Sequence, residues 1–138
     1  KVIYTKLLRE RDMGILFNQR REKIRKIISG HPKGEHYFRP ASGESMFDVR
    51  KRANQFINLI KKEKSENIAA ITHAGFIISF IMALFKLPPE EAKFIQIKPA
   101  SISKFTLDSR FRVTNFILGD ISHLIKTETN GLFSALSC

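Results

Sequence analysis

The stretch Ile68-Ala69-Ala70-Ile71-Thr72-His73-Ala74-Gly75-Phe76 decides how this chain is expected to fold. Its first five residues form a short apolar run without alternation, which is typical of a strand buried on both faces. His73 follows at the carboxyl end of that strand, and an apolar helix is expected from Phe76 to Phe85. Because such a strand needs parallel neighbours and helices on both sides, the stretch predicts an α/β fold.

The flanking sequence predicts further helices and strands. A helix capped by Asn18 is expected to run to about Ile28. A longer helix of about five turns is expected to open at the capping box Ser45-Met46-Phe47-Asp48. Strands are expected over residues 2–8, 94–98, 101–107 and 111–118, the last two of which form a hairpin.

Too few strands precede Ile68 to complete a parallel sheet. The chain also opens at Lys1, directly before the apolar, strand-like run Val2-Ile3-Tyr4. We therefore expect that part of the core is missing from this sequence. Exposed apolar surface is then expected to make the isolated chain prone to aggregate.

The composition is that of one globular domain over residues 1–138, with 43% hydrophobic residues. The longest apolar run, Ala74 to Phe85, is shorter than the roughly 20 residues that span a membrane, so no membrane segment is expected. The single cysteine, Cys138, provides no disulfide framework and indicates a reducing, cytoplasmic location.

Basic residues outnumber acidic residues by 24 to 13, which gives a formal net charge of +11. Much of the excess falls into two blocks, residues 20–26 and 50–62. Such a surface suits nucleic acid, an anionic membrane or an anionic small molecule, although solvated helix faces explain it equally well. Aromatic residues are sparse in both blocks, which argues against single-stranded nucleic acid. Nucleic acid is therefore not an expected partner.

Two side chains have clear chemical potential. His73, between the end of a strand and the start of a helix, lies where α/β sheets bind ligands, and the helix N–H groups favour an anion there. The alternative is a core histidine whose hydrogen bonds are satisfied. Glu10 lies between Arg9 and Arg11. Beside a bound phosphate such a carboxyl can retain a proton for a leaving oxygen, whereas an ion-paired surface loop is the simpler interpretation.

Four motifs occur in a fixed order along the chain. They are Leu-Arg-Glu-Arg-Asp-Met-Gly at 8–14, Gly-Glu-Ser at 43–45 followed by Asp48 and Arg52, Thr-His-Ala-Gly at 72–75, and Asp-Ile-Ser-His-Leu at 120–124. Together they resemble the histidine phosphatase superfamily, to which the cofactor-dependent phosphoglycerate mutases belong. The resemblance implies a three-layer α/β/α, phosphoglycerate-mutase-like fold with a mostly parallel sheet, whose N-terminal strand and helix are missing here.

The resemblance also implies a two-step phosphoryl transfer through phosphohistidine. By position in the motifs, Glu10 would be the acid and base and His73 the second histidine. Arg11 and Ala74 lie in substrate-contacting stretches of the motifs, while Arg39 is our own candidate for binding a substrate anion. The expected substrate is a phosphorylated small molecule, and no metal or other cofactor is required. Three further motif residues are expected to be structural: Glu44, Ser45 and His123.

The chain departs from the family pattern at one decisive point. It contains no Arg-His-Gly, the motif whose histidine attacks phosphorus, so the 138 residues alone are expected to be inactive. Asp12-Met13 replaces the His-Tyr pair of the mutases, which favours phosphate-monoester hydrolysis. Mutase-type transfer is the alternative within enzymes, and a non-catalytic basic binding module is the alternative of another class. The oligomeric state does not follow from the sequence.

Overall fold

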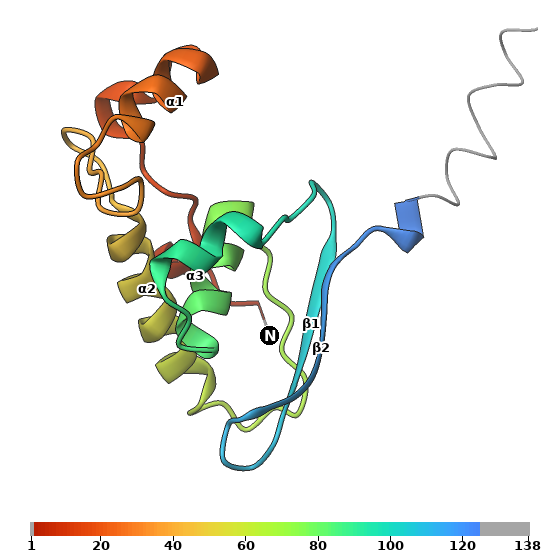
Figure 1. Ribbon diagram of the computed structural model, residues 1–138. Helices are drawn as coiled ribbons and strands as arrows, with labels where there is room; N and C mark the ends of the chain where they lie inside the picture. The colour runs from red at the N-terminus through yellow and green to blue at the C-terminus, as the bar shows by residue number, and fades with distance from the viewer. Residues whose placement is uncertain (1, 125–138) are drawn as a thin grey trace, which may run out of the picture. The chain divides into compact units, whose positions relative to one another are not determined.

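The computed structural model describes residues 2–124 and divides the chain into two compact units, Lys1–Ile95 and Gln96–Cys138 (Figure 1). Lys1 and Cys138, on which two of the expectations rest, lie outside the described residues. The single domain expected over residues 1–138 stays a prediction.

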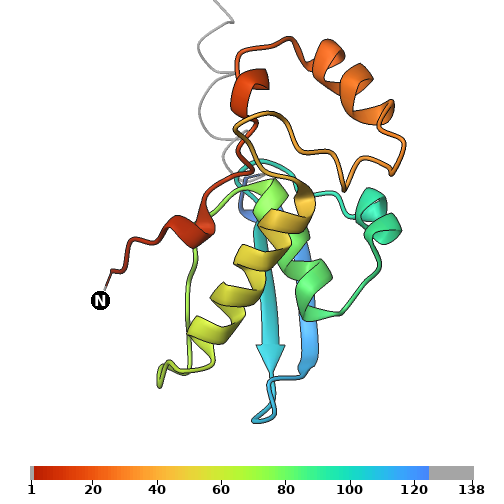
Figure 2. The same cartoon turned by 90° about the vertical axis from the view of Figure 1, so that its left-hand side faces the viewer.

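The first unit is helical. It contains the three α-helices α1 (Arg21–Ser29), α2 (Met46–Ile60) and α3 (Ala74–Leu84), and the three 3-10 helices η1 (Lys6–Leu8), η2 (Gly14–Leu16) and η3 (Pro89–Phe94). Helices α2 and α3 lie side by side in both views (Figures 1 and 2). Their contact forms the core, which consists of Val49, Ala53, Phe56 and Phe76 with partly buried side chains from η1 at its edge.

Helix α2 confirms the sequence prediction. The Ser45 hydroxyl accepts a hydrogen bond from the Asp48 N–H, and the Asp48 carboxylate accepts one from the Ser45 N–H, so the capping box is complete. The apolar residues at helical spacing then face α3, where the Phe56 and Phe76 rings meet edge to face at 6.0 Å. Helix α2 carries Arg52, which contacts the loop that holds Glu10.

Helices α1 and α3 were also predicted, with shifted starts. Helix α3 begins at Ala74, directly after His73. Helix α1 is capped by Arg20 rather than by Asn18, so the predicted N-cap was wrong. The reason is local, because the Gln19 N–H donates to the Leu16 carbonyl and continues the turn of η2 past Asn18.

Two predicted strands are absent from the first unit. Residues 68–72, predicted as a buried strand, have no regular secondary structure, and residues 68–71 are exposed. Residues 2–8 were predicted as a strand, but residues 2–5 are irregular and the rest form η1. A strand exists only by pairing with a neighbour, and no segment among residues 2–95 pairs with either run.

The second unit contains a β-hairpin, as predicted. Strands β1 (Ile102–Leu107) and β2 (Val113–Asp120) pair antiparallel, and the Asp108 carboxylate accepts bonds from the Arg110 and Arg112 N–H groups in the turn. The strand predicted over 94–98 was wrong, because Pro89 starts a 3-10 helix that runs through Phe94.

The chain is therefore a mixed helix and strand structure. The only sheet among residues 2–124 has two antiparallel strands, so the expected three-layer arrangement with a mostly parallel sheet is not present in this part of the chain. Among the same residues, no helix has the length and apolar character that crossing a membrane requires.

Candidate active site

The structure brings Glu10 and His73 to one end of helix α3. The Thr72 hydroxyl donates to the Leu8 carbonyl at 2.6 Å and so joins the segment before Glu10 to the segment before His73. The Glu10 carboxylate then accepts a bond from the Gly75 N–H at 3.3 Å, while its other oxygen accepts from the Arg11 N–H at 2.8 Å. Two residues separated by more than sixty positions in the sequence thus lie around the same helix N-terminus.

Gly75 is required for this arrangement. A Cβ atom at Gly75 would collide with the Oε1 atom of Glu10. A side chain at position 75 would therefore displace the Glu10 carboxylate from the start of α3, so the absence of a Cβ permits the close approach.

His73 is the N-cap residue of α3, with an extended backbone and no side-chain capping bond. It is exposed, so the alternative of a satisfied core histidine does not hold for this chain. Helix α3 has no acidic residue in its first turn, and its N-terminal N–H groups provide partial positive charge beside the imidazole. The end of α3 therefore presents the exposed His73 imidazole beside the Glu10 carboxylate, which accepts from the Gly75 N–H.

Arg52 positions the segment that carries Glu10, a role that the sequence interpretation missed. Its guanidinium forms a two-point ion pair with Glu44 and donates to the carbonyls of Leu7, Arg9 and Glu10. Only 13% of the Arg52 side chain is exposed. The available signal was the spacing of Glu44 and Arg52 in the second motif, but spacing alone does not reveal a bond to backbone carbonyls more than forty residues away.

Gly14 supports the same loop. It has a φ of +48°, and a Cβ atom there would collide with the Ala41 carbonyl oxygen. The Glu44 N–H donates to the Asp12 carbonyl at 2.8 Å, and the Asp12 N–H donates to the Glu44 carboxylate at 3.0 Å. Glu44 and Ser45 therefore have structural roles, as predicted.

Two carboxylates in this network have pKa values below their usual range. The hydrogen bonds from Arg52 lower the pKa of Glu44 more than its burial raises it. Burial alone would raise the pKa of Asp48, but its hydrogen bonds with Ser45 and the nearby positive charges of Arg39 and Lys51 together lower it. Both carboxylates thus stabilise the fold in their ionised form.

The predicted substrate contacts lie in different surroundings. Arg11 is half-buried, and it donates to the carbonyls of Glu44 and Phe38, while burial lowers its pKa. The Arg39 guanidinium pairs with Asp48 at 2.6 Å, although 58% of its side chain remains exposed. Ala74 is exposed beside His73. Both arginines thus have protein partners, and their contact with substrate stays a prediction.

The model of the histidine phosphatase superfamily (branch 1) matches residues 1–116 of the chain. The chain belongs to the histidine phosphatase superfamily. The resemblance inferred from the four motifs is thereby confirmed, and it supports phosphatase-type or mutase-type phosphoryl transfer in general. No curated protein sequence matched the chain at a significant level.

The match to the histidine phosphatase superfamily includes both Glu10 and His73 and ends within β2, before His123. His123 is exposed in the second unit, where the short turn after Asp120 carries it. Its expected structural role stays a prediction.

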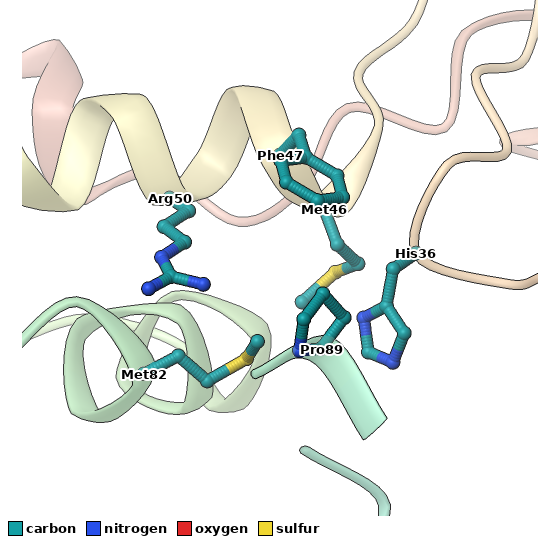
Figure 3. A pocket seen from close by; sticks show the side chains of 6 residues that line it. All are labelled: His36, Met46, Phe47, Arg50, Met82 and Pro89. Carbon is teal, nitrogen blue, oxygen red and sulfur yellow. The ribbon is translucent and has the colours of Figure 1, made fainter. Parts of the chain in front are cut away.

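His36 lines a small pocket at the other end of α3 (Figure 3). The lining residues are His36, Met46, Phe47, Arg50, Met82 and Pro89. The volume of about 10 Å³ is too small for a phosphorylated substrate. Burial lowers the pKa of His36, and its Nδ1 atom has no hydrogen-bond partner among residues 2–124. Met82 lies eight residues after Ala74, about 12 Å along the helix, so this pocket is separate from the Glu10 site.

Proposed function

We propose that this chain contributes the acid/base and the second histidine to a phosphate-monoester hydrolase that works through a phosphohistidine. Glu10 is the acid and base, and His73 binds the transferring phosphoryl group. The attacking histidine is supplied from outside these 138 residues, because no Arg-His-Gly occurs in them.

The observation that carries the proposal is the hydrogen bond that the Glu10 carboxylate accepts from the N–H of Gly75, two residues after His73. Glu10 and the N-terminus of α3 face solvent together, where a phosphate ester can approach them. Helix N–H groups and an imidazole are suitable donors for phosphoryl oxygens, and a carboxylic acid is a suitable donor for the leaving oxygen.

The reaction has two balanced steps. The histidine nitrogen forms a bond to phosphorus while the bond from phosphorus to the ester oxygen breaks, and protonated Glu10 gives its proton to that oxygen. Glu10, now a carboxylate, accepts a proton from water as the water oxygen bonds to phosphorus. The bond between phosphorus and histidine then breaks and phosphate leaves. Hydrogen bonds from His73 and the start of α3 stabilise the negative charge in both steps.

Transfer to water, rather than to a second substrate hydroxyl, is proposed because Asp12-Met13 stands where the mutases carry a His-Tyr pair. The Asp12 groups are engaged within the loop: its carboxylate accepts from the Gly14 N–H, and its carbonyl accepts from the Glu44 N–H. Phosphate transfer to an added sugar alcohol, at a rate above hydrolysis, would instead identify a mutase.

The test joins the chain to a segment that carries Arg-His-Gly and measures hydrolysis of an aryl phosphate. The unmodified chain is expected to be inactive and the fusion active. In the fusion, Glu10→Gln is expected to lower kcat about 100-fold to 10,000-fold, the range for a lost acid/base group. His73→Ala is expected to lower kcat/KM strongly, because it removes a donor to the transition state.

The matched control is Glu63→Gln, which removes an exposed carboxylate from the loop after α2 and is expected to leave activity unchanged. An active fusion whose Glu10→Gln and His73→Ala double variant retained full activity would overturn the assignment of both residues. Acid-labile, base-stable phosphate on the attacking histidine is the expected intermediate.

A basic binding module is the second candidate, and helix α1 is the observation that favours it. Four cationic residues of α1 and its N-cap make no ion pair within residues 2–124: Arg20, Arg21, Arg25 and Lys26. Binding of double-stranded DNA or RNA to this surface would weaken steeply with added salt. Measurable binding by the unmodified chain that Arg21→Glu abolishes would favour this candidate over the hydrolase.

A further inference from the structure

Helix α1 lies apart from the core of the first unit. Both views show it away from the packed pair α2 and α3 (Figures 1 and 2), and none of its nine residues is buried. A helix shorter than about 12–15 residues is marginal in water unless an apolar face packs against another surface. Among residues 2–124, no other helix packs extensively against α1.

The sequence of α1 is amphipathic. Three isoleucines spaced by three and four positions form one stripe: Ile24, Ile27 and Ile28. At 3.6 residues per turn, Lys23 lies on one side of the stripe and Arg21 and Arg25 lie on the other. Glu22 lies on the opposite, polar side of the helix. The apolar stripe is therefore flanked by cations on both sides.

A groove of about 280 Å³ lies along this stripe. Its lining residues are Arg21, Ile24, Arg25, Ile28 and Glu35. The two isoleucines are half-buried there, whereas the third, Ile27, is 37% exposed. Neither arginine makes an ion pair within residues 2–124, so the groove combines aliphatic side chains with unpaired guanidinium groups.

Exposed apolar side chains continue into the segment before α1. Phe17 follows the end of η2, four residues before α1 begins, and is 78% exposed. Ile15 within η2 is 67% exposed. Residues 20–35 contain six lysines and arginines and only two glutamates. A complementary partner thus has negative charge over a surface and an apolar layer below it.

A bilayer with anionic headgroups has both properties. Lysine and arginine lay their methylene stems along apolar surface and keep their charge among the headgroups, while isoleucine and phenylalanine enter the acyl boundary. Nucleic acid would satisfy the cations, but its phosphate backbone would leave Ile15, Phe17 and Ile27 in water. The apolar residues therefore favour the bilayer.

We propose that residues 15–28, the α1 surface, dock on an anionic lipid bilayer with α1 in the plane of the interface. Nine residues are too few to cross a bilayer, so the helix lies on it. The proposal is independent of the hydrolase chemistry at Glu10 and His73.

The test measures flotation of the 138-residue chain with lipid vesicles, because flotation separates bound chain from aggregates. Vesicles of equimolar phosphatidylcholine and phosphatidylserine are compared with vesicles of phosphatidylcholine alone. We expect binding to the anionic vesicles only, and weaker binding as added salt screens the charges. Absence of binding to anionic vesicles at low salt overturns the proposal, and so does equal binding to neutral vesicles.

The double variant Arg21→Gln with Arg25→Gln tests the charge. Each cation near an anionic leaflet contributes about fivefold in affinity, so this variant should bind about 30-fold more weakly. The matched control is Lys62→Gln with Lys64→Gln, which removes two exposed cations after α2 and should bind nearly as the unmodified chain does. Equal losses in both variants would overturn the assignment to α1, because net charge alone would then explain binding.

The double variant Ile15→Ser with Phe17→Ser tests insertion. Removing two inserted apolar side chains should weaken vesicle binding by at least about tenfold. The matched control is Ile68→Ser with Ile71→Ser, at two other exposed isoleucines, and it should bind as the unmodified chain does. Unchanged binding by the first variant would overturn insertion.

A tryptophan reports directly on the position of residue 17, since the chain has none of its own. The emission of Phe17→Trp should shift to shorter wavelength on anionic vesicles and be quenched by lipids brominated in the acyl chain. Tyr4→Trp, at a residue that is 95% exposed outside the α1 surface, should stay in water in the same bound state. An indole at position 17 that stays in water overturns the proposal.

Double-stranded DNA is the competing anion. Vesicle binding that persists in an excess of DNA phosphate supports the bilayer as partner. Vesicle binding that DNA abolishes identifies the α1 surface as a nucleic-acid site and overturns the proposal.

Discussion

Two regions of the helical unit differ in whether the described chain provides hydrogen-bond partners for their backbone N–H and C=O groups. Around Arg52 the chain provides its own partners: Glu44 pairs with the guanidinium, and the carbonyls of Leu7 and Arg9 are bonded to it. Along residues 68–71 the backbone has no partner within residues 2–124, and Ile71 is exposed. The first region holds Glu10 in place, and the second ends at His73. The comparison shows that the segment before Glu10 is held by partners within residues 2–124, whereas the backbone of residues 68–71 is not.

The largest expected effect comes from removing the ion pair and hydrogen bonds that Arg52 makes. Arg52→Ala removes a nearly buried cation, leaves Glu44 without its partner and frees three carbonyls. We expect the free energy of unfolding to fall by about 2–4 kcal/mol. Urea unfolding followed by helical circular dichroism measures it.

Lys51→Ala, at the neighbouring exposed position of α2, is the control for loss of a cation and should change stability by less than about 0.5 kcal/mol. Equal effects of the two substitutions would show that the Arg52 network does not hold the segment.

The second prediction concerns pH. Because hydrogen bonds from Arg52 lower the pKa of Glu44 below its usual 4.5, the unfolded state binds more protons than the folded state in acid. The stabilisation is complete above pH 4.5 and is lost as pH falls through the lower pKa of the folded state. Glu44→Gln should therefore reduce the acid loss of stability, measured as urea midpoints at a series of pH values. A dependence as steep as that of the unmodified chain would contradict this account.

Glu44→Gln should still lose some stability as the pH falls, because Asp48 also has a lowered pKa. The double variant that adds Asp48→Asn should flatten it further, at the expense of the α2 capping box.

The third prediction tests the contact between the motif at 8–14, which contains Glu10, and the motif at 72–75, which contains Gly75. Gly75→Ala places a Cβ atom where the Glu10 carboxylate lies, and the flexible Glu10 side chain is expected to swing away. Overall stability should change by less than about 1 kcal/mol, because alanine favours the helix that it enters. The amide resonances of Gly75's neighbours and Arg11 should shift in NMR spectra, and the active fusion should lose activity as Glu10→Gln does.

Gly30→Ala is the matched control, since a Cβ atom at Gly30 meets nothing closer than 3.5 Å. It should leave the resonances of Arg11 and the activity of the fusion unchanged. Full activity of the Gly75→Ala fusion would show that the Glu10 position in the free chain is unrelated to catalysis.

The smallest effect is expected in the unpaired region. Ile71→Ala removes an exposed side chain and should change the stability of the free chain by less than about 0.5 kcal/mol. Ile57→Ala, the same substitution at a buried position of α2, should lower it by about 2–5 kcal/mol. A large loss with Ile71→Ala would mean that residues 68–71 are already packed in solution, by self-association for example, and sedimentation at several concentrations would reveal it. The predicted tendency to aggregate is checked in the same measurement.

Local patterns predicted the elements that are stabilised locally. The capping box at Ser45, the apolar spacing of α2 and the turn after Asp108 each depend on residues near one another in sequence, and all three are present. The N-cap at Asn18 was wrong because the adjoining 3-10 turn extends past it. The strand at 68–72 was wrong because its composition indicates burial but does not supply the neighbour that burial requires.

The sequence by itself determined the helices α1 to α3, the hairpin, and the motifs that hold Glu10 and His73. Those features follow from periodicity, capping residues and motif order, which act over short distances along the chain. Only the tertiary structure decided that Arg52 holds the segment before Glu10, that Gly75 admits the Glu10 carboxylate, and that residues 68–71 find no backbone partner among residues 2–124. Each of these depends on groups far apart in sequence, and a hydrogen bond or a strand forms only where both partners are brought together in space.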